Sequence, residues 1–410
     1  MTVKWKDGFD IQKFASKLEA VKGIDAEGKA GFEGFEFDEC YSVLNNVIEC
    51  SKEMPDDEKQ IIVRKALMSA GAKGVITADI IKHELEQLEL IYLKQPQKRF
   101  VFCTSLSVNP SIKLKTTKFQ NAHIQFAYKL PDKYAKHASK HLKIAKSSLS
   151  TNPPDDYISA MISIYGRTPL DAANRAFEVI DLLRGIWNFD INRRQYMRKS
   201  YGNREPVNKI ILGPLHTLHL PTGELATEMW WYDPDYQKAQ KSSDLKEHLD
   251  HMYKTEKKAR DLLSTHNYRN LLEWGIKEYC RALDHRNWST SFLKLWSVLE
   301  VLTSTEKANY KVTIKRAAFA WADAEYHMEV LNHLRHLRNS FVHENKNSND
   351  VETHVYQLKR YVEALIKFHF ARGRIFTSLK QVSEFMDLPT NTEILKGKIN
   401  ILNLALDFRK

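Results

Sequence analysis

His336–Glu344 reads HLRNSFVHE and lies in a predicted helix that begins near Glu329. The apolar stripe of this helix consists of Leu331, Leu334 and Phe341. The position that completes its 3-4-3 spacing is Arg338, so an arginine falls on the inward face. Burying a guanidinium is costly unless it is paired or lines a cleft. The stretch therefore indicates a polar site inside a helical domain.

Asn339 follows this arginine at once, and His343 comes five residues after it, before the polar run at 345–350. A permanent cation beside a group that titrates near neutrality suits phosphodiester cleavage, with histidine transferring a proton and arginine stabilising the transition state. Two observations oppose this interpretation. Residues five apart in one helix lie about 140° apart around its axis, so a helix end or a second subunit is needed. Arg338 could also form an ordinary salt bridge with Glu300 or Glu344.

Arg338-Asn339-x-x-x-His343 resembles the motif of HEPN domains, helical bundles of prokaryotes and higher eukaryotes that bind nucleotides or act as ribonucleases. Phe292–Glu300 (FLKLWSVLE) resembles the helix that precedes this motif in the Apea-like branch of the family. An upstream helix at Leu271–Leu283 and a downstream helix complete a bundle in the expected order; the downstream helix carries Val351, Val355, Leu358, Val362 and Leu365. The resemblance covers about residues 245–375.

The resemblance implies a metal-independent endoribonuclease, without cofactor, in which the ribose 2′-hydroxyl attacks the adjacent phosphate to leave a 2′,3′-cyclic phosphate. It implies that His343 transfers the proton, that Arg338 stabilises the transition state and that Asn339 orients one of them. It also implies a homodimer that pairs the motif helices across a two-fold axis. Apea-like proteins often act as toxin-like effectors of anti-phage, abortive-infection defence. By that analogy, the N-terminal part is a sensor or regulator that responds to a phage-derived trigger or a regulatory partner.

The pattern of the whole chain predicts an α+β protein, a mixed α/β N-terminal region followed by an all-α, HEPN-like helical bundle. Four segments are expected: a helical segment at 1–95, an α+β regulatory region at 96–240, the bundle at 241–380 and a helical extension at 381–410. Period-2 patterns and turn residues predict strands at Arg99–Val108, Ala122–Tyr128, Tyr157–Tyr165, Val207–Leu212, His216–Leu220 and near Trp230–Tyr232. Thr168 and Pro169 open a predicted helix that runs to about Phe189.

The positive charge of the chain is concentrated in one segment. Between Ile91 and Leu149 there are 12 Lys or Arg and one acid, Asp132, an excess equal to the net charge of +11. We expect this segment to contact RNA through the side chains of Lys113, Lys115, Lys118, Lys136 and Lys140. Phe119, Phe126 and Tyr128 are interleaved as candidate stacking surfaces. The alternative is a solvated basic helix and strand edge without a partner.

Several classes of protein are excluded or disfavoured. The chain has 410 residues and 43% hydrophobic residues, enough for two or three folded domains. Its four cysteines form no CxxC pair, and the pairs His137/His141 and His216/His219 have no supporting ligands, so no metal site is expected. No phosphate-binding glycine loop, GxSxG or HExxH occurs. Without an apolar leader or membrane span in the sequence, we expect a cytoplasmic protein with no membrane contact.

Two other functions fit the sequence. The chain could be a non-catalytic HEPN module that serves for dimerisation or for binding nucleotides or nucleic acid, with the basic segment 91–149 as the true contact. It could also be a structural subunit of a larger defence complex. The complete Arg-Asn-x-x-x-His pattern favours the ribonuclease.

Overall fold

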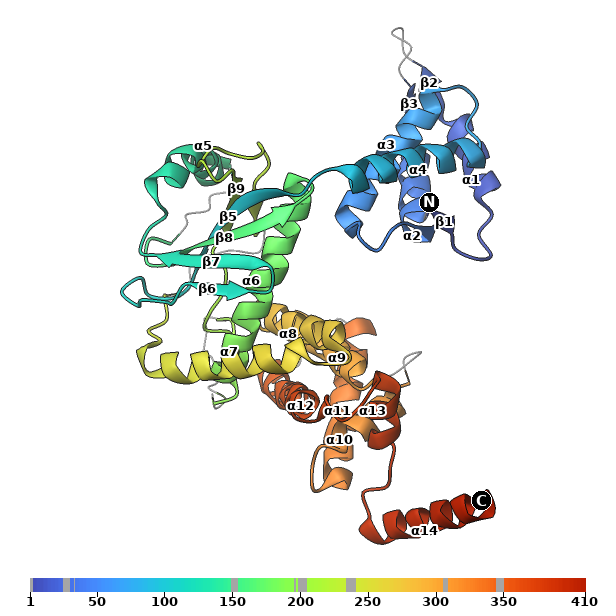
Figure 1. Cartoon of the computed structure of the whole chain (residues 1–410), viewed down its shortest axis with the longest axis vertical. Helices are drawn as coiled ribbons and strands as arrows, with labels where there is room; N and C mark the ends of the chain where they lie inside the picture. The colour runs from blue at the N-terminus through green and yellow to red at the C-terminus, as the bar shows by residue number, and fades with distance from the viewer. Residues whose placement is uncertain are drawn as a thin grey trace.

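The computed structural model describes residues 3–24, 30–32, 34–148, 154–194, 197, 205–233, 241–304, 309–343 and 350–410; within them, the side chains of residues 24, 30, 146, 148, 342 and 343 are excluded. It is a mixed α/β protein with a six-stranded sheet in the N-terminal half and helices in the C-terminal half, which confirms the predicted fold class. Figure 1 shows a helical N-terminal unit at one end, the sheet next to it, and the C-terminal helices at the other end.

The N-terminal unit has a hydrophobic core of its own, built on side chains such as Leu44, Leu67 and Leu85. Its predicted helical character is confirmed, and two small two-stranded sheets accompany the helices. Polar contacts join the unit to the rest of the chain: Arg167 donates to Glu53 at 2.7 Å, and Asn174 donates to Asp57 at 2.8 Å. Its elements are β1 (Lys4–Trp5), α1 (Ile11–Ala20), β2 (Lys22–Ile24), β3 (Ala30–Phe32), α2 (Phe35–Val47), β4 (Ile48–Glu49), α3 (Asp56–Ala72) and α4 (Ala78–Lys94).

The central sheet is antiparallel throughout, with strand order β10-β9-β5-β8-β7-β6. Its strands are β5 (Lys98–Leu106), β6 (Thr117–Phe119), β7 (Ala122–Ala127), β8 (Ile158–Gly166), β9 (Leu215–His219) and β10 (Trp231–Tyr232). The strands predicted from period-2 patterns are confirmed, with one exception. Val207–Leu212 is not a strand, because it meets β5 only through an isolated bridge between Leu212 and Leu106, while the Ile210 amide donates to the side chain of Asn188 at 3.0 Å.

Helix α6 (Pro169–Asn192) covers one face of the sheet (Figure 1). Thr168 caps it by accepting a hydrogen bond from the Asp171 amide at 3.1 Å, as the Thr-Pro pair predicts. Alternate side chains of the central strands, including Phe102 and Ile162, pack toward α6. Their neighbours pack on the opposite face against α5 (Asp132–Ser148).

The C-terminal helices continue the core of the sheet. One buried cluster extends from Phe100 to Met386, so the change near residue 240 is a change of secondary structure and not a break in the core. Helix α8 packs closely on α6 because Gly185 has no side chain; a Cβ there would lie 3.0 Å from Ile276. The elements are η1 (Lys246–His248), α7 (Leu249–Ser264), α8 (Arg269–Asp284), α9 (Trp288–Leu302), α10 (Tyr310–Ala318), α11 (Ala324–His343), α12 (Val351–Arg372), α13 (Leu379–Met386) and α14 (Thr392–Phe408).

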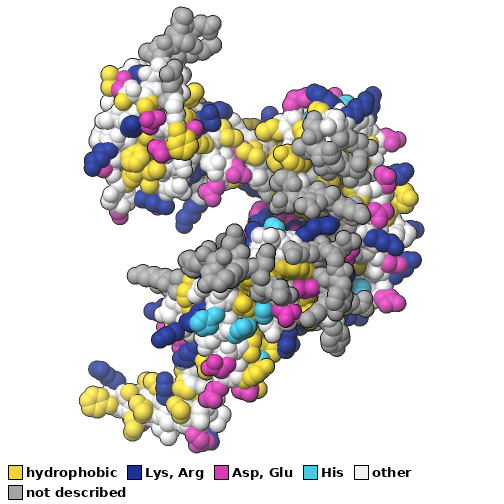
Figure 2. Space-filling view, turned by 180° about the vertical axis from the view of Figure 1, so that it is seen from behind, with side chains coloured by type: hydrophobic (Ala, Val, Ile, Leu, Met, Phe, Trp, Pro, Cys, Tyr) yellow, Lys and Arg dark blue, Asp and Glu magenta, His cyan; other side chains and the backbone are white. Residues whose placement is uncertain are grey.

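The last helix, α14, stands away from the rest of the chain (Figure 1), and none of its side chains is buried. Its apolar side chains are visible at the lower end of the molecule in Figure 2, and Leu404 is 70% exposed. Across the described residues, no helix combines the length and the apolar character needed to span a membrane.

Candidate active site and nucleic-acid interface

The motif helix α11 begins at Ala324, five residues before the predicted start. The reason is an N-terminal cap: the carboxylate of Asp323 accepts a hydrogen bond from the Tyr326 amide at 3.1 Å. Leu331 and Leu334 are fully buried, and Phe341 packs edge-on against Phe292 of α9 with ring centres 5.3 Å apart. The apolar stripe of the motif helix therefore faces the core, as its spacing predicts.

Arg338 is half-buried on this stripe, and its guanidinium lies over the ring of Tyr310, 5.4 Å from the ring centre. Its Nη1 donates a hydrogen bond to Asn339 Oδ1 at 3.4 Å. No carboxylate among the described side chains pairs with it. Glu300, one of the two expected salt-bridge partners, instead accepts from the indole N–H of Trp296 at 3.0 Å. The other, Glu344, lies outside the described residues.

Helix α11 continues without interruption to His343, whose side chain lies outside the described part of the structure. In a regular helix this position is about 140° around the axis from Arg338. The motif positions of a single chain therefore do not share a face of α11.

Sequence reasoning gave no role to His336, which is exposed on the same helix. Seven residues separate positions 336 and 343, so they lie within about 20° of each other around the axis. Helical spacing could have identified this second histidine. A further pair, His333 of α11 and His354 of α12, has ring centres 5.4 Å apart, and burial lowers the pKa of His354.

Three of the five predicted RNA-binding lysines lie together. Lys113, Lys115 and Lys118 are exposed beside or within β6, at one edge of the sheet. Helix α7 packs against this edge: the amide of Lys115 donates to the hydroxyl of Tyr253 at 2.9 Å, and its ammonium group lies 5.0 Å from the centre of that ring. Helix α7 adds the exposed Lys257, so the β6 edge and α7 form one cationic surface, called the β6–α7 surface below.

The other two lysines are elsewhere. Lys136 and Lys140 are exposed on α5, which contacts β9, and three strands separate β9 from β6 in the sheet. Lys140 also forms a salt bridge with Glu228 at 2.7 Å. The lysines that follow one another in the sequence therefore form two groups, because the strands and helix that carry them lie in different parts of the sheet.

Two of the three predicted stacking surfaces are wrong. Phe119 is 3% exposed and lies beneath the guanidinium of Arg260, and Phe126 packs against Trp187 of α6. Both side chains point to the α6 face of the sheet because of strand alternation. Tyr128, just after β7, is 64% exposed.

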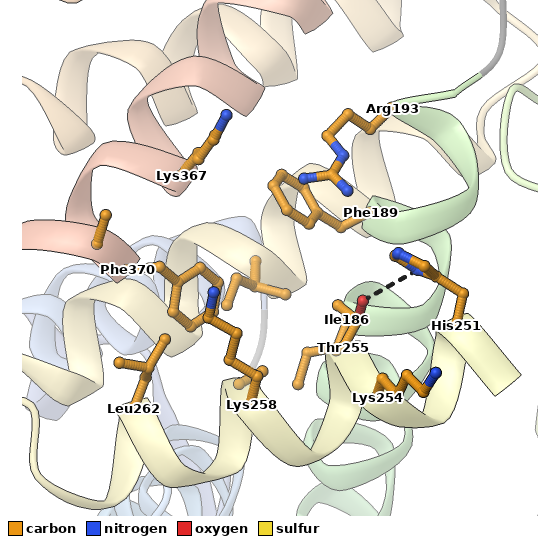
Figure 3. A pocket seen from close by; sticks show the side chains of 13 residues that line it. Ile186, Phe189, Arg193, His251, Lys254, Thr255, Lys258, Leu262, Lys367 and Phe370 are labelled. Atoms are coloured by element: carbon orange, nitrogen blue, oxygen red, sulfur yellow. Dashed lines mark hydrogen bonds between the residues drawn. The ribbon is translucent and has the colours of Figure 1, made fainter.

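A cavity of about 560 Å³ lies among α6, α7, α8 and α12, and sequence reasoning did not identify it (Figure 3). Its lining extends from Ile186 to Ala371 along the chain. Each helix contributes only a few positions, so no local pattern marks the site. The only local feature that could have indicated the site is the group of lysines on α7, Lys254, Lys257 and Lys258.

A buried ionic network connects α6 and α8. Arg184 is 2% exposed and forms salt bridges of 2.6 Å with Asp181 and with Asp284. Burial alone would lower the pKa of Arg184, but the two carboxylates raise it well above its usual value, so the guanidinium remains charged. Arg281 adds a hydrogen bond to Asp181 at 2.7 Å. The network fixes the packing of the two helices.

Comparisons of this chain with protein-family models, with curated proteins and with solved structures gave no match. The resemblance to HEPN domains consequently depends on the residues of this sequence alone.

Proposed function

We propose that this protein is a cytoplasmic, metal-independent endoribonuclease that cleaves RNA by attack of the 2′-hydroxyl on the adjacent phosphate. The observation that carries the proposal is the environment of Arg338. Its guanidinium is held on the ring of Tyr310, on an inward stripe, with no carboxylate partner among the described side chains. A cation in that state is available to stabilise negative charge on a phosphate.

His343 is the proposed proton-transfer residue, and Asn339 the residue that orients Arg338 through the 3.4 Å contact. Since the two motif positions face different sides of α11, we infer that the cleft combines Arg338 of one chain with His343 of a second. A two-fold axis across α11 meets that requirement. The proposal includes a role in defence, in which a phage-derived trigger or regulatory partner releases the activity.

The decisive experiment is incubation of the purified full chain with total cellular RNA and a tRNA pool in EDTA, with analysis of the 3′ ends. We expect 2′,3′-cyclic phosphate ends from the unmodified protein. Arg338→Ala should reduce cleavage about 10²- to 10³-fold, as loss of a transition-state donor does, and His343→Ala should abolish it. Arg335→Ala is the matched control, because it removes an arginine one turn earlier on the same helix and should cleave normally.

Undiminished cleavage by both motif variants contradicts the ribonuclease. The dimer has its own test, because Arg338→Ala and His343→Ala chains mixed together should regain part of the activity. Each chain then supplies the residue that the other lacks. If mixing restores nothing while the unmodified protein cleaves, the two residues act within one chain.

The β6–α7 surface favours a second function, a non-catalytic module that binds nucleic acid. Charge reversal at Lys113, Lys115 and Lys118 should then remove RNA binding and decrease its salt dependence, by about 0.7 in log–log slope for each lost contact to single-stranded RNA. Charge reversal at Lys6, Lys52 and Lys65, which are exposed in the N-terminal unit, is the control of equal charge. RNA binding that depends on β6, together with no cleavage by the unmodified protein, supports the module over the ribonuclease.

A further inference from the structure

The cavity among α6, α7, α8 and α12 has an apolar floor. Figure 3 shows two aromatic rings in it, Phe189 from α6 and Phe370 from α12. The remaining apolar lining is aliphatic and consists of Ile186, Ala259, Leu262, Ile276 and Ala371. With a volume of about 560 Å³, the cavity is in the size range of sites for small organic ligands.

The rim of this cavity is cationic. Arg193 lies at the end of α6, and Lys367 lies on α12 (Figure 3). Lys254 and Lys258 lie one turn apart on α7. All four side chains are exposed, and no acidic side chain is among the lining residues. The three lysines form no salt bridge with any described carboxylate. Four cations around one apolar floor repel each other, and an anion bound among them would remove that repulsion.

One carboxylate lies behind the rim and organises part of it. Asp190 is 2% exposed; His251 Nδ1 lies 2.8 Å from its Oδ2, and Thr255 donates to its Oδ1 at 3.0 Å. Arg193 approaches the same carboxylate at 3.6 Å. Asp190 therefore positions His251 and Arg193 at the cavity and compensates at most part of the charge of the rim.

We propose that this cavity binds a small phosphate ester with an aromatic or aliphatic body. The rim cations bind the phosphate groups, and the body lies between Phe189 and Phe370. Lysine and arginine are the usual side-chain partners of phosphate, through charge-assisted hydrogen bonds. The apolar floor distinguishes this site from the β6–α7 surface, where phosphates of a nucleic-acid chain would meet exposed lysines. Ligand binding in this cavity does not require the proposed ribonuclease activity.

The experiment measures binding to the full chain by equilibrium dialysis, with the midpoint of thermal unfolding as a second readout. The probes are ATP, octyl phosphate, inorganic triphosphate and adenosine. ATP has an aromatic body and octyl phosphate an aliphatic one, while triphosphate lacks a body and adenosine lacks phosphate. We expect one of the two esters to bind at least tenfold more tightly than triphosphate and adenosine, and to raise the midpoint by linkage.

Two variants test the location of the site. Lys258→Ala/Lys367→Ala removes two rim charges and should weaken binding of the ester at least tenfold. Ala371→Trp leaves all charges in place, fills the cavity from an exposed position and should also weaken binding. The matched control is Lys246→Ala/Lys380→Ala, which removes two exposed lysines outside both the cavity and the β6–α7 surface and should bind normally.

Three results overturn the proposal. The first is no binding of either ester at about 1 mM, the weak end of specific affinities. The second is equal loss of binding in the rim variant and in its control, which indicates attraction by overall charge. The third is loss of RNA binding in the rim variant without any ester binding to the unmodified protein, which assigns the cavity to the RNA-binding surface.

Discussion

Arg184 and Arg338 are two arginines on the inward side of two helices, and their surroundings differ in one respect. Arg184 on α6 is 2% exposed and lies 2.6 Å from each of two carboxylates, Asp181 and Asp284. Arg338 on α11 is half-buried on the ring of Tyr310 and has no described carboxylate partner. Carboxylates compensate the charge of the first arginine, whereas the described contacts of the second are the ring of Tyr310 and the neutral side chain of Asn339.

Removing a charge from water has a large free-energy cost, which nearby opposite charges must offset. Asp181 and Asp284 do so for Arg184, and the result is a fixed contact between α6 and α8. Arg338 retains part of its hydration and its capacity to bind an anion. An inward arginine therefore indicates a functional site only where no neighbouring acid neutralises it.

The largest expected effect is the loss of stability in Arg184→Met. This change leaves the half-buried Asp284 without its salt bridge and the buried Asp181 with Arg281 alone. It should lower the free energy of unfolding by about 3–5 kcal/mol. Arg338→Met leaves no carboxylate of the described residues without its cation and should lower the free energy of unfolding by less than about 1 kcal/mol. Urea unfolding followed by tryptophan fluorescence measures the difference, since six of the eight tryptophans lie in or against the larger core.

Equal losses in the two variants would remove the distinction between a structural and an available arginine. Arg335→Met, on α11 but with no role in the motif, provides the baseline for replacing an arginine on this helix.

An intermediate effect is expected from two buried histidines, one in the sheet region and one in the helical bundle. Burial lowers the pKa of His216, beside Thr104, to about 3 and the pKa of His369 to about 4. The ring of His369 bonds the Leu302 carbonyl at 2.8 Å and Tyr268 at 3.1 Å. Both side chains are therefore neutral in the folded protein at neutral pH.

The unfolded chain protonates these histidines near pH 6.5, well above their folded pKa values. Below pH 6.5 the unfolded state thus binds more protons, and stability falls as the pH falls. Each histidine should remove about 1.4 kcal/mol per pH unit until its folded pKa is reached. Urea unfolding between pH 7 and pH 5 measures the slope. His369→Gln should reduce that slope by about 1.4 kcal/mol per pH unit, the contribution of one titrating histidine. The control His336→Gln removes an exposed histidine and should leave the slope unchanged. Identical slopes in all three proteins would contradict the neutral, buried state of His369.

Local patterns predicted most of the fold. The long strands have apolar side chains at every second position, and α6 has a capping threonine and a first-turn proline, so each signal lies within its own element. The segment at Val207–Leu212 has the composition of a strand but pairs with β5 only through an isolated bridge at Leu212. Its backbone bonds go to residues such as Asn188, more than 20 positions away, which no local pattern contains.

The same limit explains the outcome for the candidate sites. The inward position of Arg338 follows from the helical spacing of one segment. The cationic groups depend on which elements become neighbours, and for that reason Lys136 and Lys140 are separated from the β6 edge. The cavity rim combines Arg193, Lys258 and Lys367, whose chain positions are unrelated. A functional residue can be predicted from sequence when its position depends on one helix. A site whose residues come from several elements can be identified only from the folded structure.

The smallest expected effect tests whether Tyr310 holds Arg338 in place. Exposed cation–π contacts contribute about 0.5–1 kcal/mol, so a double-mutant cycle of Tyr310→Leu with Arg338→Met should give a coupling energy of this size in urea unfolding. The cycle of Tyr310→Leu with Arg335→Met should give none, because the ring of Tyr310 lies against Arg338. Tyr310→Phe keeps the ring face and should retain the coupling. If the coupling energy is lost in Tyr310→Phe, the hydroxyl of Tyr310 and not its ring face interacts with Arg338. The ring would then not stabilise the charge of Arg338 in the way that two carboxylates stabilise Arg184.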